Sequence, residues 1–499
     1  MAPPRSGKKQ AAKHIAIYSA GSIIRQLAGF IMLPIYTSYL TPADYGVVGL
    51  LVVMISLFEL VMGARFAQAV PKFYYESDEA AWQNTVVSTA LLVTLFISAI
   101  STMLVAFFSK SIAQILFGSD GYQIHVAIYC VLLFTSAIEA YGLAFLRLKE
   151  KPVLFMTNSI AKLILQLALN ILFVVHYELG VMGVIYSALI SSCVISLWVA
   201  IYIVYHAGII VDFSLTKRLF RFSWPLWLAG IAGLYVASSN RYFIRIFSDL
   251  EQVGLYELAT KFAMVLPMLI WNPFSQWWQT ERFKIYRSAD KGVSVFPVVF
   301  EAMVIIMVIA AATISLFSGS LIKAMASPEF HSASRAIPIL VFGVLLSNLR
   351  FFFFFSFLVT EKTIIITYIK YFSAVLATLL YVGLIPNFKF LGAAVAVLLA
   401  EFTVLIVSST LSKRYFDNQI KLKKSLLVIS SVLALLVVEH WVEASLQSPS
   451  LIVLTQVAAL VIILSICAVM VLTTPELKNA LKEVVVYFKQ RLKTKKKLI

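Results

Sequence analysis

The 499-residue sequence contains little cysteine, and its few candidate ligands for metals are scattered. Its three cysteines, Cys130, Cys193 and Cys467, each stand alone in an apolar stretch, so their spacing supports neither a disulfide framework nor a metal site. The six histidines form no close cluster. No glycine-rich loop followed by Lys and Ser or Thr occurs, so we expect no ATP hydrolysis by this chain. We expect no cofactor, no metal and no enzyme activity.

Charge is also scarce, because 13% of the residues are charged whereas 61% are hydrophobic, with a mean hydropathy of +0.91. A soluble domain of this composition would lack the polar residues that cover a surface. The sequence holds about fourteen apolar stretches near the ~20 residues that a membrane-spanning helix needs. They cover approximately residues 13–40, 47–70, 83–108, 123–147, 153–176, 181–206, 222–247, 253–279, 294–317, 336–360, 363–386, 390–412, 425–442 and 450–472. We therefore expect an all-α polytopic membrane protein.

Acidic residues are fewer than basic ones, 24 against 41, and the basic ones are unevenly placed. Lys and Arg gather in the connections that follow even-numbered stretches, for example at Lys149, Lys151, Lys421 and Lys423. The alternate connections hold only Lys110, Lys323, Arg335 and Lys389. The positive-inside rule then predicts that both termini are cytoplasmic. The net charge of +17 thus reflects membrane topology and does not indicate a nucleic-acid partner.

Both ends of the sequence are basic. Residues 1–12 precede an apolar stretch that is too long for a secretory signal and is interrupted by Arg25, so we interpret it as the first spanning helix after a cytoplasmic tail. Residues 473–499 alternate Leu, Val and Phe with Lys and Arg at helical spacing. This pattern predicts an amphipathic helix on anionic membrane lipids, and a solvated tail is the alternative.

The sequence repeats itself at the level of short motifs. The residues 40–47 (LTPADYGV) return in looser form as 248–255 (SDLEQVGL), and Phe66 with Gln68 returns as Phe274 with Gln276. Because six helices return the chain to the same side, the two halves are expected to be parallel repeats, as in transporters that bind substrate between two lobes. The predicted parts are an N-lobe (13–212), a C-lobe (213–412) and two further helices (425–472).

Charged residues inside the predicted helices are the remaining chemistry. Each costs about 2.5 to 3.5 kcal/mol at the centre of a spanning helix, so it is expected to face a cavity or a partner. The cations are Arg25, Arg65, Lys162, Arg241, Arg245, Lys261, Arg350 and Lys370, and the anions are Glu59, Glu139, Glu257, Glu301 and Glu401. The surplus of cations favours an anionic substrate, because guanidinium groups bind phosphate bidentately. The alternatives are pairing among these residues, as between Glu257 and Lys261 at i and i+4, and snorkelling of Arg245.

Two further features leave alternatives open. The fifth stretch carries Asn158, Lys162, Gln166 and Asn170 at successive steps of four, a polar face that lines a pathway or joins helices through hydrogen bonds. Glu59 is either a proton or sodium site or the partner of a neighbouring Arg.

The opening of the chain resembles a known family. Residues 33–46 (LPIYTSYLTPADYG), a second apolar helix and then residues 72–76 (KFYYE) look like the start of bacterial polysaccharide transporters. These are the O-antigen and exopolysaccharide flippases of the superfamily that also holds multidrug and toxic compound exporters and lipid II flippases. The helix count and the repeat extend the resemblance over about the first 412 residues.

The resemblance implies two six-helix lobes in a V around a central cavity in the bacterial inner membrane. It implies translocation of an undecaprenyl-diphosphate-linked oligosaccharide to the outer leaflet, with a polysaccharide polymerase and a chain-length regulator as partners. In related flippases, cations on the first two helices of each lobe line the cavity, and here those helices carry Arg25, Arg65, Arg241 and Lys261. Lys162 and Lys370 take roughly equivalent places in the two halves, so we expect both to face the cavity.

Two other functions are considered. A cation-coupled drug exporter of the same fold is expected to have an acidic, aromatic cavity, which the cation surplus opposes. A membrane glycosyltransferase or ligase of the same pathway needs acid and base residues on a sizeable outward loop. The outward connections are too short for such a loop. No motif specifies the sugar.

Overall fold

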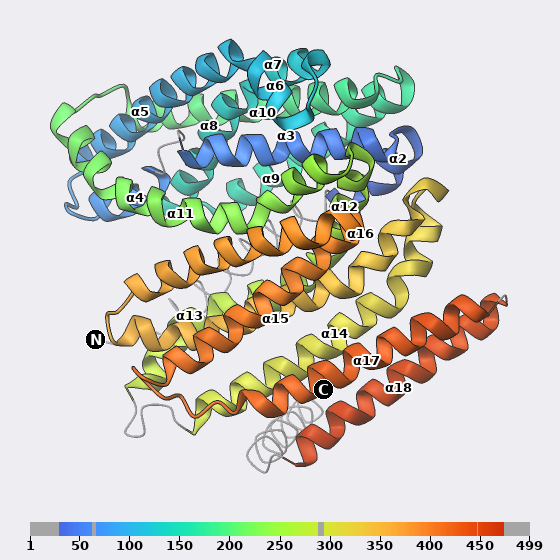
Figure 1. Cartoon of the computed structure of the whole chain (residues 1–499). Helices are drawn as coiled ribbons and strands as arrows, with labels where there is room; N and C mark the ends of the chain where they lie inside the picture. Colours follow the sequence, from blue (N-terminus) through green and yellow to red (C-terminus); the bar gives the residue numbers. More distant parts are fainter. Residues whose placement is uncertain (1–28, 62–65, 288–293, 447, 474–499) are drawn as a thin grey trace, which may run out of the picture. The chain divides into compact units, whose positions relative to one another are not determined.

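The computed structural model describes residues 29–61, 66–287, 294–446 and 448–473 (Figure 1). These residues form helices and contain no strand. Eleven helical segments of the described chain are long and apolar enough to cross a membrane. The all-helical, polytopic membrane fold expected from composition is therefore confirmed, and we describe the two compact units of the chain separately.

One predicted pair of spans is continuous in the structure. Helix α16 (Ile364–Ser412) runs for 49 residues and covers the two stretches predicted at 363–386 and 390–412. Lys389 has φ 51° and ψ −132°, which is not helical, and Pro386 lies just before it. Because proline lacks an amide donor and clashes with the preceding turn, a kink is expected at this place. The segment is thus two spans joined at Lys389.

The first unit extends to Leu258 and also takes in residues 325–330 and 377–393. Its helices are α2 (Leu33–Tyr39), α3 (Pro42–Val61), α4 (Phe66–Tyr74), α5 (Ala80–Phe107), α6 (Ser109–Phe117), α7 (Gln123–Tyr129), α8 (Val131–Leu148), α9 (Pro152–Asn170), α10 (Gly180–Ala207), α11 (Phe213–Phe247) and the start of α12 (Leu250–Ala263). Helix α8 packs on α5 and α10. Buried Tyr141 of α8 donates to the carbonyl of Val87 on α5 at 2.7 Å.

The chain leaves α10 and enters α11 through a short, well-defined connection. Gly208 has φ 72°, a backbone conformation that glycine adopts without strain, and it ends α10. Asp212 caps α11, because its Oδ1 accepts from the amides of Ser214 at 2.7 Å and Leu215 at 3.1 Å. The hydrogen bonds from Leu215 and Ser214 lower the pKa of Asp212 below its usual value.

Helices α3 and α12 touch through their backbones. A Cβ on Gly46 would lie 2.1 Å from the carbonyl oxygen of Leu250, and a Cβ on Gly254 would lie 1.8 Å from that of Pro42. Small residues allow this close approach in membrane helix pairs. Gly46 and Gly254 occupy matching places in the two copies of the short motif found in the sequence, so the contact joins equivalent positions of that motif.

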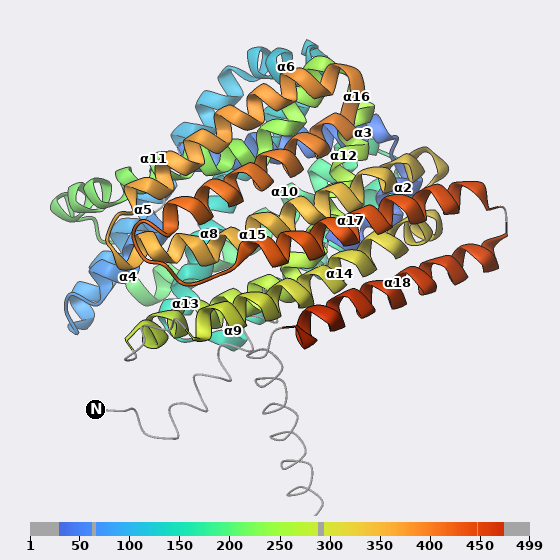
Figure 2. The same cartoon turned by 60° about the horizontal axis from the view of Figure 1, so that its bottom comes forward.

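The second unit holds residues 259–324, 331–376 and the chain from 394. Its helices include α13 (Asn272–Tyr286), α14 (Val295–Met325), α15 (Ile337–Val359), α17 (Leu422–Ser445) and α18 (Pro449–Leu472). An aromatic cluster binds α13 to α15, where Trp278 and Phe352 have ring centroids 5.5 Å apart. Helices α17 and α18 lie side by side in both views (Figures 1 and 2).

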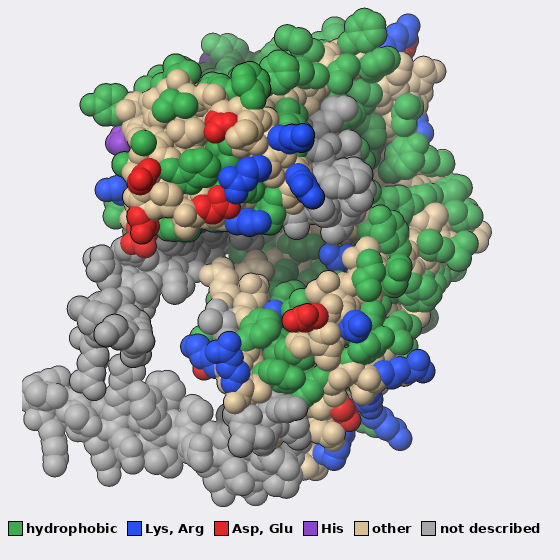
Figure 3. Space-filling model, turned by 90° about the vertical axis from the view of Figure 1, so that its left-hand side faces the viewer, with side chains coloured by type: hydrophobic (Ala, Val, Ile, Leu, Met, Phe, Trp, Pro, Cys, Tyr) green, Lys and Arg blue, Asp and Glu red, His purple; other side chains and the backbone are tan. Residues whose placement is uncertain are grey.

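Many large apolar side chains of the described chain are exposed. Large side chains such as Phe107 (81% exposed) and Leu454 (63% exposed) are uncovered, as expected where lipid is the solvent. On the face drawn in Figure 3, Lys and Arg side chains lie near Asp and Glu side chains, with hydrophobic ones around them. The amphipathic tail predicted at 473–499 and the tail at 1–12 lie outside the described residues, apart from Thr473.

Candidate functional site

A buried charge pair of the first unit joins α11 to α12. Arg241 Nε donates to Glu257 Oε2 at 2.7 Å, and the two side chains are only 12% and 15% exposed. Arg241 Nη1 also donates to the carbonyl of Ala237 at 3.2 Å and to Asn240 Oδ1 at 3.1 Å. The guanidinium is thus held in one orientation by a carboxylate, an amide and a backbone carbonyl.

Side chains and a glycine next to Arg241 and Glu257 hold the two charged groups in place. Asn240 Nδ2 donates to the hydroxyl of Tyr256 at 2.8 Å, and the Arg241 guanidinium lies 5.8 Å from the centroid of the Tyr256 ring. Gly49 of α3 leaves room for the Glu257 carboxylate, which a Cβ there would contact at 3.3 to 3.5 Å. A side chain at position 49 would therefore press on the Glu257 side chain, which would have to shift by a few tenths of an ångström.

A second charge pair joins α8 to α9. Lys162 Nζ is hydrogen-bonded to Glu139 Oε2, and their side chains are 24% and 11% exposed. One turn away on α8, the hydroxyl of Ser136 donates to Glu59 Oε1 of α3. Glu59 is therefore hydrogen-bonded to Ser136. Arg65, the neighbouring arginine considered as its partner, lies outside the described residues. These contacts connect three helices through charged or polar groups.

The polar face of α9 joins helices at two of its four positions. Besides the Lys162 contact, Asn170 Oδ1 accepts from the hydroxyl of Tyr36 on α2 at 3.2 Å. Asn170 Nδ2 donates to the carbonyl of Gln166 at 2.8 Å. Asn158 is buried, and its Nδ2 has no hydrogen-bond partner among the described residues. The interpretation of this face as a connection between helices is thus supported at Lys162 and Asn170.

The second unit contains its own buried pair. Arg350 Nη1 of α15 donates to Glu401 Oε2 of α16 at 2.7 Å, and Arg350 Nη2 lies 3.3 Å from the hydroxyl of Ser347. The candidate Lys261 lies on α12 and Lys370 on α16, both partly buried. Arg25, like Arg65, lies outside the described residues. Ion pairs thus join Arg241 to Glu257, Lys162 to Glu139 and Arg350 to Glu401.

One buried arginine, Arg282, lies between the predicted stretches 253–279 and 294–317 and was not among the candidate cations. Arg282 of α13 is 5% exposed, and its guanidinium carbon lies 5.2 Å from the ring centroids of Phe351 and Phe355. Burial lowers the pKa of Arg282 to about 10, so the group is still charged at neutral pH. Only the aromatic run at 351–355 could have indicated this contact, as a cation–π partner.

In each of these pairs a buried charge is compensated by an opposite one. In a medium of low polarity a lone charge is costly, and each pair removes that cost while leaving further donors on the guanidinium. An anion that approaches Arg241 would compete with Glu257 for the same N–H groups.

Helices of this kind and number define a multi-pass membrane protein, and the fold is that of known transporters. The structure is similar to "Lipid II flippase MurJ, inward closed conformation", with a TM-score of 0.70 and 13% identity over 90% of this chain and 98% of that chain. It is also similar to an inward-facing multidrug resistance transporter of the MATE family and MOP superfamily, with a TM-score of 0.61 and 17% identity over 78% and 94% of the two chains. Identities this low show a shared fold.

The family follows from the sequence itself. Residues 11–277, more than half of the chain, match the family model described as "Polysaccharide biosynthesis protein". The chain belongs to this family. A comparison with curated protein sequences gives no match.

Proposed function

We propose that the protein is a flippase that moves an undecaprenyl-diphosphate-linked oligosaccharide from the cytoplasmic to the outer leaflet of the bacterial inner membrane by alternating access. The observation that carries the proposal is the family match over residues 11–277, because the family's description names polysaccharide biosynthesis. The fold shared with a lipid II flippase supports transport of a lipid-linked substrate. Two parallel lobes, at 13–212 and 213–412, are part of the same proposal.

The buried cations are proposed to bind the diphosphate. Arg241 and Lys162 pair with carboxylates in the structure, at Glu257 and Glu139. A diphosphate carries more negative charge than one carboxylate and accepts from more donors, so it can replace the internal partner. Arg25, Arg65, Lys261 and Lys370 are proposed to complete the site. Glu59 is proposed as a coupling or ion-pair residue.

The test is genetic and chemical. Deleting the gene should cause the lipid-linked oligosaccharide to accumulate on the cytoplasmic leaflet, and the wild-type gene should restore export. Arg241→Gln should fail to restore it, whereas Arg218→Gln should succeed, because Arg218 pairs with Glu76 at the surface with a side chain that is 49% exposed. Accumulation of no such lipid, together with increased sensitivity to cationic drugs, would favour a multidrug exporter and contradict the proposal.

A further inference from the structure

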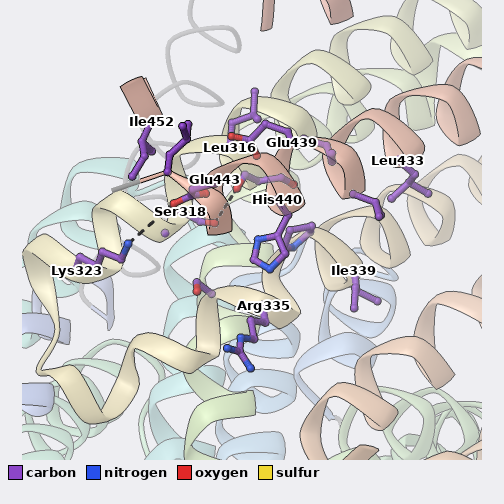
Figure 4. A pocket seen from close by; sticks show the side chains of 17 residues that line it. Leu316, Ser318, Lys323, Arg335, Ile339, Leu433, Glu439, His440, Glu443 and Ile452 are labelled. Carbon is purple, nitrogen blue, oxygen red and sulfur yellow. Dashed lines mark hydrogen bonds and ion pairs between the residues drawn. The ribbon is translucent and has the colours of Figure 1, made fainter. Parts of the chain in front are cut away.

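A cavity of about 460 Å³ lies in the second unit (Figure 4), and neither Arg350 nor Glu401 is among its lining residues. Helices α14, α15, α17 and α18 line it, together with the short helix η4 (Pro328–Ala336). Leu316, Leu436 and Ile452 give it apolar walls, and a few polar side chains lie among them. Apolar walls with a few polar groups are typical of a site for a small molecule.

Groups of both charges line this cavity. Lys323 Nζ of α14 lies 3.9 Å from Glu443 Oε1 of α17, a contact drawn in Figure 4. Glu439 lies one helical turn before Glu443, so the two carboxylates occupy one face of α17. Arg335 adds a guanidinium, whose fork of N–H donors matches a phosphate group. A ligand with one cationic and one anionic group would complement this lining.

One of the acidic groups lacks a donor. Glu439 Oε1 is buried, and no hydrogen bond to it comes from the part of the chain that the structure describes. A buried oxygen that loses its water and gains no donor destabilises the fold by about 1 to 3 kcal/mol. Within the described residues, no group of three His, Cys, Asp or Glu side chains is suited to a metal ion. A primary ammonium group would supply the N–H donor that Glu439 Oε1 lacks among the described residues.

The cavity lies at the ends of its helices. Lys323 is two residues before the end of α14, and Glu443 is two residues before the end of α17. Trp441, on the same turn as His440 of the lining, is 76% exposed. Tryptophan is enriched at membrane–water interfaces, where its ring reaches lipid and its N–H reaches water. This depth is that of phospholipid headgroups, in the leaflet that the charge asymmetry predicts to be the outer one.

We propose that the cavity binds the headgroup of phosphatidylethanolamine. The primary ammonium of the lipid donates to Glu439, its phosphate accepts from Arg335, and its acyl chains continue along the apolar side chains. Phosphatidylcholine carries a quaternary ammonium with no N–H, and phosphatidylglycerol carries no cation, so neither satisfies Glu439. The cavity should therefore select phosphatidylethanolamine over both lipids, whatever the chain transports.

The test uses the full chain in detergent and short-chain lipids below their critical micelle concentration. Dioctanoyl phosphatidylethanolamine should bind at least 10-fold more tightly than dioctanoyl phosphatidylcholine or phosphatidylglycerol, measured as the concentration dependence of the thermal unfolding midpoint. Equal binding of the three lipids by the wild-type protein would overturn the proposal without any variant. Binding of free phosphoethanolamine as tightly as of the lipid would also overturn it, because the ligand would then be a soluble compound.

Two variants locate the site. Glu439→Gln should lose the preference for phosphatidylethanolamine over phosphatidylcholine, because its amide no longer attracts the ammonium. Glu329→Gln is the matched control, since Glu329 is an exposed carboxylate of η4 that does not line the cavity. The control should keep the full preference. Retention of the preference in Glu439→Gln, or its loss in both variants, would show that the selectivity arises elsewhere.

Discussion

At the scale of single residues, the pair of Arg241 and Glu257 has two separable roles, in stability and in the proposed binding of substrate. Breaking a buried pair leaves an uncompensated charge and typically costs 3 to 5 kcal/mol, whereas replacing both partners costs far less. Replacing both partners does not restore the guanidinium group that the proposed substrate binds. Stability and transport should therefore respond differently to the same set of variants.

We expect Arg241→Gln and Glu257→Gln each to lower the free energy of unfolding by about 3 kcal/mol, and the double variant to recover most of that loss. Export should fail in Arg241→Gln and should stay absent in the double variant. Thermal unfolding in detergent and a polysaccharide export assay measure the two quantities. Restored export in the double variant would limit Arg241 to a structural role.

At the scale of elements, the cap of α11 offers a test of a single helix terminus. Asp212→Ala should lower the free energy of unfolding by about 1 kcal/mol at neutral pH, because two amides lose their acceptor. Asp212→Asn should lose only a few tenths, since asparagine is also a good cap. Denaturation at several pH values measures the free energy of unfolding of the wild-type protein and of both variants.

The pH dependence of this cap has a definite sign. The pKa of Asp212 is lowered in the folded state, mainly by the hydrogen bond from Leu215. Its stabilisation is therefore present above the unfolded-state pKa of about 3.9 and is lost as the pH falls through the lower folded-state pKa. The difference between wild type and Asp212→Ala should shrink on acidification. A difference that grows at low pH would contradict the assignment of the cap.

The crossing of α3 and α12 predicts a second result at this scale. Gly46→Ala and Gly254→Ala should each destabilise the protein by about 1 to 3 kcal/mol, because the added methyl meets backbone that cannot move aside. The double variant should lose less than the sum, since both methyl groups separate the same two helices. Gly383→Ala is the control, as nothing lies within 4 Å of a Cβ there. If the loss of stability in the double variant equals the sum of the two single losses, the two methyl groups act at independent contacts.

The sequence predicted helices better than it predicted their contacts. Length and hydropathy suffice to find a span such as α14, because the bilayer demands a long apolar helix whatever its neighbours are. The partner of Glu257 was not predictable in the same way. The sequence places Lys261 within reach on the same helix, whereas the contact with Arg241 arises from the packing of α11 on α12.

Arg282 is also more buried than the sequence around it indicates. Arg282 stands among other charges near a connection, a pattern typical of a solvated helix end, yet aromatic rings more than 60 residues later in the chain cover it. Lys389 lies in the connection that the sequence predicts between the stretches 363–386 and 390–412. The structure places a helical residue on each side of it, so the interruption bends the chain without a loop.

At the scale of the whole molecule, the orientation in the membrane is the main expectation left to test. The asymmetry of Lys and Arg predicts that the exposed residue Gln114 faces outward and that Asp78 faces the cytoplasm. In a background without native cysteines, an impermeant maleimide added to intact cells should label Gln114→Cys and spare Asp78→Cys. Permeabilised cells should show labelling of both. Labelling of Asp78→Cys alone in intact cells would reverse the topology.

The contact between Gly46 and Gly254 bears on how such a chain arises. Each glycine approaches the backbone carbonyl of the residue four positions before the other glycine. Gly46 meets Leu250 and Gly254 meets Pro42, so the contact is reciprocal. If the two halves were separate, identical subunits, one glycine would meet its own copy across a two-fold axis, as in an isologous dimer interface. A single glycine in an unduplicated gene would then have supplied both sides of the crossing. Fusion of two such genes would have freed the copies to diverge everywhere except where the backbones touch.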